Sequence, residues 1–449
     1  MTEVIPFIST RFNPRDVPDL GLAIAPPYDE ITPELRDILY ARHPYNIVRI
    51  VNGKCQAGDD AEHNRYIRAS NEFNEWKAKL VLLEDEKVCY KIYEMEHARE
   101  GGAPVKLRGF IGLVRLGSLG KDDILPHLQT FLPPKTDRLR LYKAVQANLC
   151  PITMLYNNPE GDCEKLLDKA AKGAPEHEFT DDSGVTHRIW TCVNSNIIQK
   201  IRNTMRKRRL YIADGHHRYE AARKFQIDMH RQLPQADYHQ PFDHILTFFI
   251  DASHQPDSTL PSHRVLCNDL GDGVELDEVF EDLEVYFDRK DLKVDLRKPK
   301  EALKQLEKAL QDLPQQGFSA IMLLPDGRAS ALTIKEGIEP ADLIDDDEIP
   351  DGLKEQTSII IESNIIARIW LGNPEMKLEY NDSVYYHEIE SVIQSLSNRK
   401  GCVAFLTRPL KFDEIIQLAD DGMRLPPRST CVFPKPASGV AIHDLQIRI

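Results

Sequence analysis

Long hydrophobic runs are absent from this 449-residue chain. No window approaches the roughly 20 consecutive apolar residues that a helix needs to cross a bilayer. Residues 1–8 are also too few, and are followed too soon by polar residues, to form a signal peptide. These absences argue against a membrane-spanning protein or a membrane partner and predict a cytoplasmic one.

Closely spaced cysteine pairs are missing as well. The eight cysteines lie at positions 55, 89, 150, 163, 192, 267, 402 and 431. None of these spacings matches a zinc or redox motif, and such a scatter is typical of proteins in a reducing compartment. We therefore expect free thiols, most of them buried.

Positive charge is in deficit, because the formal net charge is −14. Proteins that bind DNA or RNA through phosphate attraction usually carry an excess of Lys and Arg, so this balance argues against a nucleic-acid partner. The one basic cluster, residues 200–209, lies on a predicted helix. It is either a solvated helix face or a feature that attracts anionic ligands.

Repeats and low-complexity segments are also absent. The composition, 41% hydrophobic and 29% charged, is ordinary for a globular protein and excludes disordered and fibrous classes. A chain of this length has room for two or three domains with substantial cores.

What the sequence does contain is a polar turn between an apolar strand, residues 210–213, and a helix with apolar periodicity. The turn is Asp214-Gly215-His216-His217-Arg218. Backbone N–H groups at the start of a helix bind anions, and glycine lets the chain approach a phosphate closely. His217 and Arg218 add donors and charge, and we expect Arg218 at the mouth of the site. Asp214 is the candidate ligand for Mg²⁺.

Two other interpretations of this turn are open. It could be an ordinary surface turn, or its histidines could bind a metal ion. Adjacent histidines at a helix start point in different directions, and no cysteine pair accompanies them, which argues against zinc. The clustering of carboxylate, glycine, histidines and arginine favours a phosphate site.

Gly215, Arg218 and Ala221 form a Gly-x-x-Arg-x-x-Ala pattern that resembles the nucleotide-phosphate box of the ParB and sulfiredoxin superfamily. The Asp-Gly-His-His-Arg string resembles the archaeal free-serine kinases within it. This resemblance implies that Gly215, His216, His217 and Arg218 hold the phosphates of ATP or ADP, with CTP as a third candidate, together with Mg²⁺. His216 stands where sulfiredoxin has its catalytic cysteine, which argues against sulfinic-acid repair because that chemistry needs a thiolate.

The whole chain resembles the family called domain of unknown function 1015. The motifs that carry this resemblance are residues 25–29, 44–46, 137–139, 211–219, 260–264, 427–430, 433–435 and 438–439. The resemblance implies further nucleotide-binding residues, Thr130 and Arg138. It also implies substrate or secondary contacts from Tyr28, His263, Arg264, Arg428, Ser429 and Lys435.

One motif departs from the family pattern. The family's Pro-His-Glu box is Pro126-His127-Leu128 here, followed by Gln129-Thr130. The resemblance to the serine kinases implies that a glutamate in this box is the base that deprotonates the attacking hydroxyl. Leu128 cannot accept a proton. His127, Asp29 and Asp214 are the candidate catalytic residues in its place, since phosphoryl transfer depends mainly on positioning and charge stabilisation.

The predicted fold is α/β (α+β) and multi-domain, with a ParB/sulfiredoxin-like nucleotide-binding core. Four stretches are expected: a mixed α/β domain (1–118), the nucleotide-binding core (119–265), an α/β module (266–400) and a C-terminal α/β segment that closes on the core (401–449). Helical spacing predicts helices at 64–80, 135–148, 303–313, 358–370 and 412–421. Strands are expected at 87–94, 110–116, 151–156, 242–251, 319–324 and 402–407.

Two functions remain open from these observations. The first is a serine-kinase-like phosphotransferase that binds a nucleotide and acts on a small hydroxylated metabolite. The second is a non-catalytic nucleotide sensor, or a ParB-like protein with a macromolecular partner. The sequence leaves open the acceptor, the nucleotide, and whether the chain forms a homo-oligomer.

Overall fold

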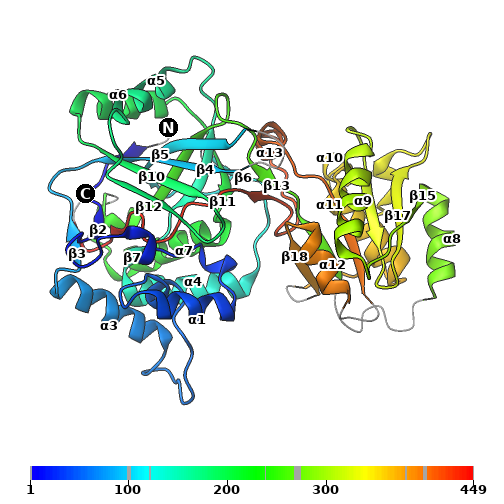
Figure 1. The fold of residues 1–449 in the computed structure, drawn as a ribbon. Helices are drawn as coiled ribbons and strands as arrows, with labels where there is room; N and C mark the ends of the chain where they lie inside the picture. The colour runs from blue at the N-terminus through cyan, green and yellow to red at the C-terminus, as the bar shows by residue number, and fades with distance from the viewer. Residues whose placement is uncertain are drawn as a thin grey trace. The chain divides into compact units, whose positions relative to one another are not determined.

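The computed structural model describes residues 3–98, 103–120, 123–237, 239–266, 275–379, 382–397 and 402–447 (Figure 1). It divides into two compact units. The first comprises Met1–Pro126, Thr130–Ser258 and Val432–Ile449, and the second comprises His127–Gln129 and Thr259–Cys431. Cys267 lies outside the described residues; the other seven cysteines are not joined in disulfides, and five of them are buried.

The first unit is built on a nine-stranded sheet of order β6-β11-β8-β12-β5-β4-β10-β9, with β1 paired to β5. Its strands are β1 (Val4–Ile5), β4 (Tyr90–His97), β5 (Val105–Arg115), β6 (Ile124–Pro126), β8 (Ile152–Tyr156), β9 (His177–Thr180), β10 (Thr186–Cys192), β11 (Leu210–Asp214) and β12 (His244–Asp251). Only the pairs β6–β11 and β8–β12 are parallel. Two short sheets, β2 (Thr10–Phe12) with β3 (Leu82–Glu84) and β7 (Ala147–Asn148) with β21 (His443–Asp444), accompany it.

Helices cover both faces of this sheet. They are α1 (Pro33–Arg42), α2 (Val48–Val51), α3 (Arg65–Ala78), α4 (Leu132–Val145), α5 (Asp162–Ala170), α6 (Ser195–Met205) and α7 (His216–Gln232), with the short turns η1 (Leu20–Leu22), η2 (Tyr28–Glu30) and η3 (Pro241–Asp243). Figure 1 shows α5 and α6 on one side of the sheet and α4 and α7 on the other.

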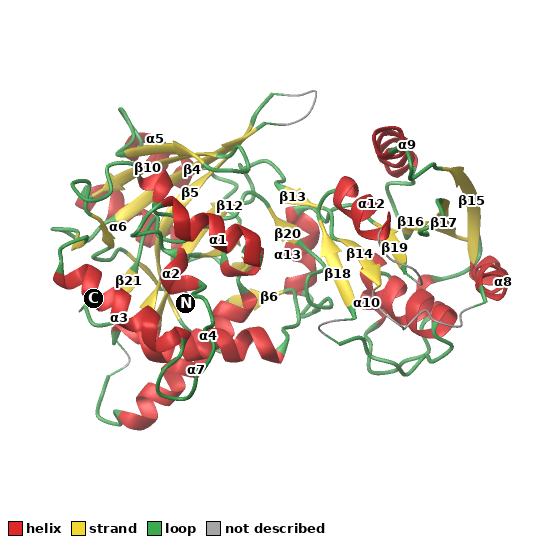
Figure 2. Cartoon of the chain, turned by 60° about the horizontal axis from the view of Figure 1, so that its bottom comes forward, coloured by secondary structure: helices red, strands yellow, loops and turns green. Residues whose placement is uncertain are grey.

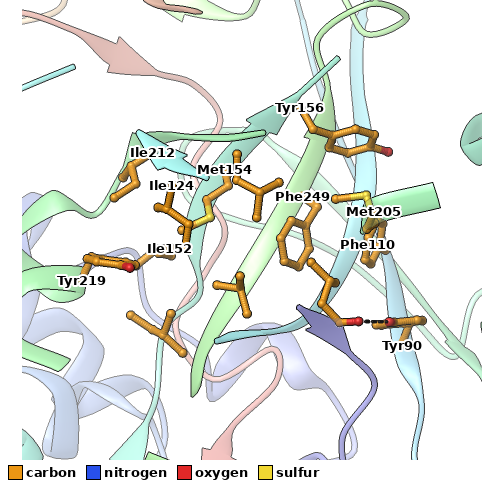
Figure 3. Packing of buried hydrophobic residues seen from close by; sticks show 14 of the residues in the cluster. Tyr90, Phe110, Ile124, Ile152, Met154, Tyr156, Met205, Ile212, Tyr219 and Phe249 are labelled. Carbon is orange, nitrogen blue, oxygen red and sulfur yellow. Dashed lines mark hydrogen bonds between the residues drawn. The ribbon is translucent and has the colours of Figure 1, made fainter. Parts of the chain in front are cut away.

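Strand β12 is buried at all eight of its positions. A strand covered on both faces carries apolar side chains at successive positions rather than at alternating ones, as at Ile245-Leu246 and Phe248-Phe249-Ile250 here. Around it, the rings of Phe110 and Phe249 stack with centroids 4.9 Å apart. The Tyr90 hydroxyl donates to the Val4 carbonyl at 3.2 Å, so this core polar group is satisfied (Figure 3).

Helix α3 confirms the helix predicted at 64–80. The Asn64 side chain accepts from the N–H groups of Tyr66 and Ile67, which caps the helix start. Ala69, Phe73 and Trp76 are buried and recur at helical spacing, so they form one apolar face. The helix therefore forms where a capping residue and a 3.6-residue apolar period coincide.

The second unit contains a six-stranded sheet of order β15-β17-β16-β19-β14-β18 (Figure 2). Its strands are β14 (His263–Leu266), β15 (Phe287–Lys293), β16 (Ser319–Leu323), β17 (Arg328–Ile334), β18 (Ser383–Tyr386) and β19 (Val403–Leu406), and the short β13 (Thr259–Leu260) and β20 (Cys431–Val432) lie outside it. Its helices are α8 (Leu276–Tyr286), α9 (Pro299–Asp312), η5 (Pro340–Leu343), α10 (Asp351–Lys354), α11 (Thr357–Ile359), η6 (Ile360–Trp370), α12 (Ile389–Ser397) and α13 (Phe412–Asp420).

Side chains of this sheet alternate between two apolar cores. In β16, Ile321 and Leu323 belong to a core that includes residues of α9 and α12. Ala320 and Met322 belong to the opposite core, which includes residues of α8 and η6. Because successive side chains of a strand point to opposite faces, apolar side chains lie on both faces of the sheet and helices pack against each.

The fold is α/β with more than one compact unit, as predicted. Each unit combines strands from two of the predicted stretches. In the first unit, β12 (from 119–265) pairs with β5 (from 1–118); in the second, β19 (from 401–449) pairs with β16 (from 266–400). The division into four domains stays a prediction. No helix within the described residues is long and apolar enough to cross a membrane.

Candidate functional site

The predicted strand, turn and helix are present as β11, Gly215 and α7. Gly215 has φ +93°, a conformation that favours glycine, and a Cβ there would lie 2.6 Å from Ile152 Cγ2. The Tyr219 N–H donates to the Gly215 carbonyl at 2.9 Å, so the 17-residue α7 begins directly after the turn. Ala222 and Phe225 of α7 are buried and belong to the same apolar core as residues of the sheet.

Arg218 lies inside the unit rather than at the open mouth of the site expected from the sequence. It is 4% exposed, and its Nη1 donates to the Pro151 carbonyl at 2.5 Å and lies 2.9 Å from Cys150 Sγ. Its Nη2 donates to Asp214 Oδ2. Burial disfavours the charged guanidinium, but Cys150 and Asp214 outweigh it and raise the pKa of Arg218.

Lys435 meets Asp214 from the C-terminal segment of the first unit. Its side chain is 9% exposed and its Nζ lies near three carboxylates: Asp29 Oδ2 at 3.3 Å, Glu30 Oε1 at 3.1 Å and Asp214 Oδ1 at 3.3 Å. We call Asp29, Glu30, Asp214, Arg218 and Lys435 the ion cluster. It joins residues from three distant parts of the chain.

The two neighbouring acids of the cluster differ in pKa. Burial favours protonated Asp29, but attraction to Lys435 and Arg218 outweighs this and holds the pKa of Asp29 well below its usual range. Burial, together with the charge of Asp29, raises the pKa of Glu30 against the opposing effect of Lys435. The side chains of Asp29 and Glu30 expose 33% and 37% of their surface, so burial removes only part of the solvent around each carboxyl.

Glu30 was missed by the sequence analysis. The available signal was its place directly after Asp29 in a proline-rigidified loop, because a short turn such as η2 presents consecutive side chains together. A carboxyl with a raised pKa beside a cation is a better proton acceptor near neutral pH than one with a strongly lowered pKa.

Two segments far apart in the chain hold the ion cluster together. The Ser438 N–H donates to the Ala25 carbonyl at 2.7 Å, and Ser438 Oγ donates to the Pro26 carbonyl at 3.1 Å. These bonds fix the segment that carries Lys435 beside the loop that carries Asp29. The family motifs at residues 25–29 and 433–439 are therefore one structural feature.

Arg138 and Tyr28 form a wall beside Arg218. The Arg138 guanidinium lies 3.9 Å from the centroid of the Tyr28 ring, and its Nη1 donates to the Val51 carbonyl at 2.9 Å. Burial, assisted by Asp29, raises the pKa of Tyr28. A cavity of about 30 Å³, near the size of one water molecule, is lined by Tyr28, Val51, Arg138, Leu141, Tyr142, Ala147, Leu149, Cys150, Arg218 and Ser438.

His217 and Thr130 connect α7 to the start of α4. His217 Nε2 accepts from the Phe131 N–H at 2.9 Å, and Thr130 Oγ1 donates to Glu220 Oε1 at 3.0 Å. His216, the other histidine of the turn, is 5% exposed. These contacts satisfy an N–H at the beginning of α4 and orient the His217 ring.

Five other predicted site residues belong to the second unit: His127, His263, Arg264, Arg428 and Ser429. Arg264 Nη1 donates to Glu362 at 3.0 Å, and the guanidinium groups of Arg264 and Arg428 lie 5.0 and 5.9 Å from the centroid of Tyr385. His127 Nε2 and Thr430 Oγ1 are 2.8 Å apart. His263 Nδ1 accepts from the Thr407 N–H at 3.2 Å, and Ser429 Oγ donates to the Pro426 carbonyl at 2.8 Å.

Leu128 is a core residue of the second unit. It is 8% exposed and belongs to the same apolar cluster as Leu425. The Gln129 N–H donates to the Leu425 carbonyl, and the Leu425 N–H donates to the His127 carbonyl, both at 2.9 Å. A leucine at this position therefore has a packing role in place of the proton-accepting role of a glutamate.

The residues do not fit a magnesium site made by the protein alone. Within the described ranges, no group of three His, Cys, Asp or Glu side chains has the geometry to hold a metal ion. Asp214 carries carboxylate oxygens, which suit Mg²⁺, but one oxygen accepts from Arg218 and the other contacts Lys435.

The chain belongs to the family described as "Protein of unknown function (DUF1015)", whose model matches residues 4–358. No significant match was found among curated proteins.

Several solved structures resemble the chain distantly. A mutant of a free serine kinase in complex with AMP has 12% identity and a TM-score of 0.33, covering 73% of this chain and 91% of that one. A conserved hypothetical protein from Pyrococcus furiosus has the same identity and TM-score, covering 73% and 94%. SbnI with a C-terminal truncation, from Staphylococcus aureus, has 12% identity and a TM-score of 0.33, covering 72% and 84%. Similarity at this level does not by itself indicate a shared activity.

Proposed function

We propose that the first unit binds a nucleotide and transfers its terminal phosphoryl group to a small hydroxylated metabolite. The observation that carries this proposal is the ion cluster next to the Gly215 turn. Two cations and three carboxylates meet there at the start of a long helix, whose N-terminus attracts phosphate. ATP or ADP, with CTP as an alternative, would supply the phosphoryl group.

Each residue of the cluster has a role in this proposal. Lys435 and the N–H groups at the start of α7 attract phosphate oxygens, while Arg218 holds Asp214 in place. Glu30, whose pKa is raised, takes the proton from the acceptor hydroxyl. Asp29 stays ionised and orients Lys435. This assignment moves the base to a residue that the loop presents to solvent, which makes a glutamate at position 128 unnecessary.

Other predicted residues keep proposed roles. Tyr28 and Arg138 support the phosphate site from its wall, and His216, His217 and Thr130 support the turn. His127 stays a predicted catalytic residue, and His263, Arg264, Arg428 and Ser429 stay predicted substrate contacts; all five belong to the second unit and have no role in the site of the first. Serine is the acceptor suggested by the motif resemblance, and Mg²⁺ would arrive on the nucleotide, since divalent cations commonly bind through phosphates and few protein ligands.

A non-catalytic nucleotide-binding protein is the second candidate. One observation favours it: both cations of the ion cluster are already paired with its own carboxylates. A nucleotide must compete with these contacts, and the binding energy spent on this exchange is not available for transition-state stabilisation.

Thermal unfolding with ATP, ADP and CTP, each with and without Mg²⁺, tests the proposal. A ligand that binds only the folded chain raises its melting temperature, by roughly 5 °C at a concentration of 100 times Kd. We expect this rise for the wild type and its loss in Asp214→Asn. Lys224→Met, a change at a half-exposed lysine farther along α7, is the matched control and keeps the rise.

Phosphoryl transfer is then assayed with a panel of hydroxylated metabolites. Glu30→Gln is expected to lower turnover at least 100-fold while it preserves nucleotide stabilisation, since it removes the base but retains the side-chain shape. No nucleotide response from folded wild type contradicts both candidate functions. A response without turnover on any acceptor favours the non-catalytic one.

A further inference from the structure

Lys435 occupies the point where the carboxylates of the ion cluster converge. The three oxygens lie 3.1–3.3 Å from its Nζ. An ammonium group has three N–H donors and no acceptor, so it can donate one hydrogen to each carboxylate. Asp29, Glu30 and Asp214 thus surround a cation that is covalently part of the chain.

A divalent metal ion cannot share this position with the ammonium group. Mg²⁺ needs oxygen ligands at about 2.0–2.1 Å in octahedral geometry, whereas the oxygens here stand at hydrogen-bonding and ion-pairing distances from nitrogen. Asp214 also accepts a hydrogen bond from Arg218. The ammonium of Lys435 lies between these acids, and among the described residues no group of three His, Cys, Asp or Glu side chains could hold a metal ion.

The backbone holds this cation in place. Lys435 lies three residues before Ser438, whose N–H and carbonyl pair with the Ala25 carbonyl and N–H at 2.7 and 3.3 Å. The Ala437 N–H also donates to the Tyr93 hydroxyl at 3.4 Å. The segment is therefore anchored to the loop that carries Asp29 and Glu30, and its ammonium is preorganised rather than carried on a free tail.

Charge balance shows what removal of this cation would do. Three carboxylates against Lys435 and Arg218 leave the ion cluster with a formal charge of −1. Without Lys435 the formal charge is −2, and three oxygen-bearing side chains are left without their central partner. Such a set of hard oxygen donors is what divalent cations prefer.

We propose that Lys435 is the resident cation of the site and excludes divalent metal from its carboxylates. Its ammonium takes the position that a protein-bound metal would take, and presents a fixed positive charge to the incoming phosphate. This last role rests on the proposed function, whereas metal exclusion does not. The protein then needs no metal ligand of its own, and any Mg²⁺ enters only on the nucleotide.

Calorimetric titration with Mn²⁺ alone tests the exclusion. We expect no saturable binding by the wild type and at least tenfold tighter binding by Lys435→Met. The gain should disappear in the double variant that adds Asp214→Asn. Lys106→Met is the matched control, because Lys106 also lies near two carboxylates, Glu94 at 3.8 Å and Glu96 at 3.1 Å.

Two results overturn the inference. One is Mn²⁺ binding by the wild type that is saturable and as tight as binding by Lys435→Met. The other is a folded Lys435→Met that binds Mn²⁺ no more tightly than the wild type. Lys435→Gln provides a second neutral side chain, and circular dichroism with cooperative unfolding establishes which variants are folded. Mn²⁺ should raise the melting temperature only of the folded Lys435 variants. If no nucleotide stabilises the wild type, the proposed function fails while the Mn²⁺ result still decides the exclusion.

Discussion

At the scale of single residues, neighbouring groups of the same kind acquire different chemistry from their surroundings. Asp29 and Glu30 are adjacent carboxylic acids that contact the same ammonium. Burial acts to raise the pKa of both acids. At Asp29 the attraction of Lys435 and Arg218 outweighs burial and lowers the pKa, whereas at Glu30 burial and the charge of Asp29 outweigh Lys435 and raise it. Separated pKa values of this kind let one acid stay ionised while the other exchanges a proton.

His443 gives a pH-dependent contribution to stability. Burial lowers its pKa to about 4, despite a hydrogen bond to the Pro241 carbonyl. The unfolded chain, with a histidine pKa near 6.5, binds a proton that the folded chain does not. The contribution of His443 to the free energy of unfolding is therefore fully present above pH 6.5. It is lost as the pH drops toward 4, and the loss is about 2 kcal/mol at pH 5.

Urea unfolding at pH 7 and pH 5 measures this contribution. We expect His443→Gln to lose less stability than the wild type between these two values. His63→Gln, at a side chain that is 80% exposed, is the control and should match the wild type. Equal losses in the wild type and His443→Gln contradict the assignment.

At the scale of elements, the segment 127–129 illustrates how a motif can change its role. Leu128 packs with Leu425 in the second unit, and its neighbours pair with the backbone of residue 425. A glutamate there would place a charge in an apolar cluster. Burial of an unpaired charge is costly, so Leu128→Glu would not simply supply a catalytic base.

Leu128→Glu should accordingly destabilise the second unit by more than about 3 kcal/mol, and Leu128→Met by less than about 1.5 kcal/mol. Chemical denaturation of both variants measures the difference. A glutamate variant as stable as the methionine variant would show that the side chain at position 128 is not held in the core.

At the scale of the whole chain, the first unit is discontinuous in sequence. The chain leaves it at Ser258 and returns at Val432. The Phe433 N–H donates to the Ser258 carbonyl at 2.9 Å, so the points of departure and return are neighbours. The second unit is thus an insertion whose ends meet, a connection that domains tolerate well.

Replacing residues 259–431 by a short Gly-Ser linker should leave a folded first unit, provided that Leu128 is changed to Ser to avoid an exposed apolar side chain. Circular dichroism and a cooperative thermal transition are the measurements. The nucleotide response should survive, because the ion cluster belongs wholly to the first unit. A chain that unfolds without cooperativity contradicts this account of the insertion.

Much of the fold could be predicted from local sequence. A capped apolar period predicts α3, a segment rich in apolar residues predicts β12, and the Asp214-Gly215 turn predicts the junction of β11 with α7. These features depend on residues within a few positions of one another, where periodicity and backbone preference decide the structure.

The sequence by itself determined the α/β class and the strand, turn and helix around Asp214-Gly215, and it predicted candidate residues at positions 29, 214, 218 and 435. Only the tertiary structure decided that Lys435 meets Asp29 across the chain, that Arg218 is buried, and that Leu128 is a core residue. The physical reason is the range of the interactions. Local preferences act over a few residues, whereas burial and ion pairing depend on which distant segments the fold brings together.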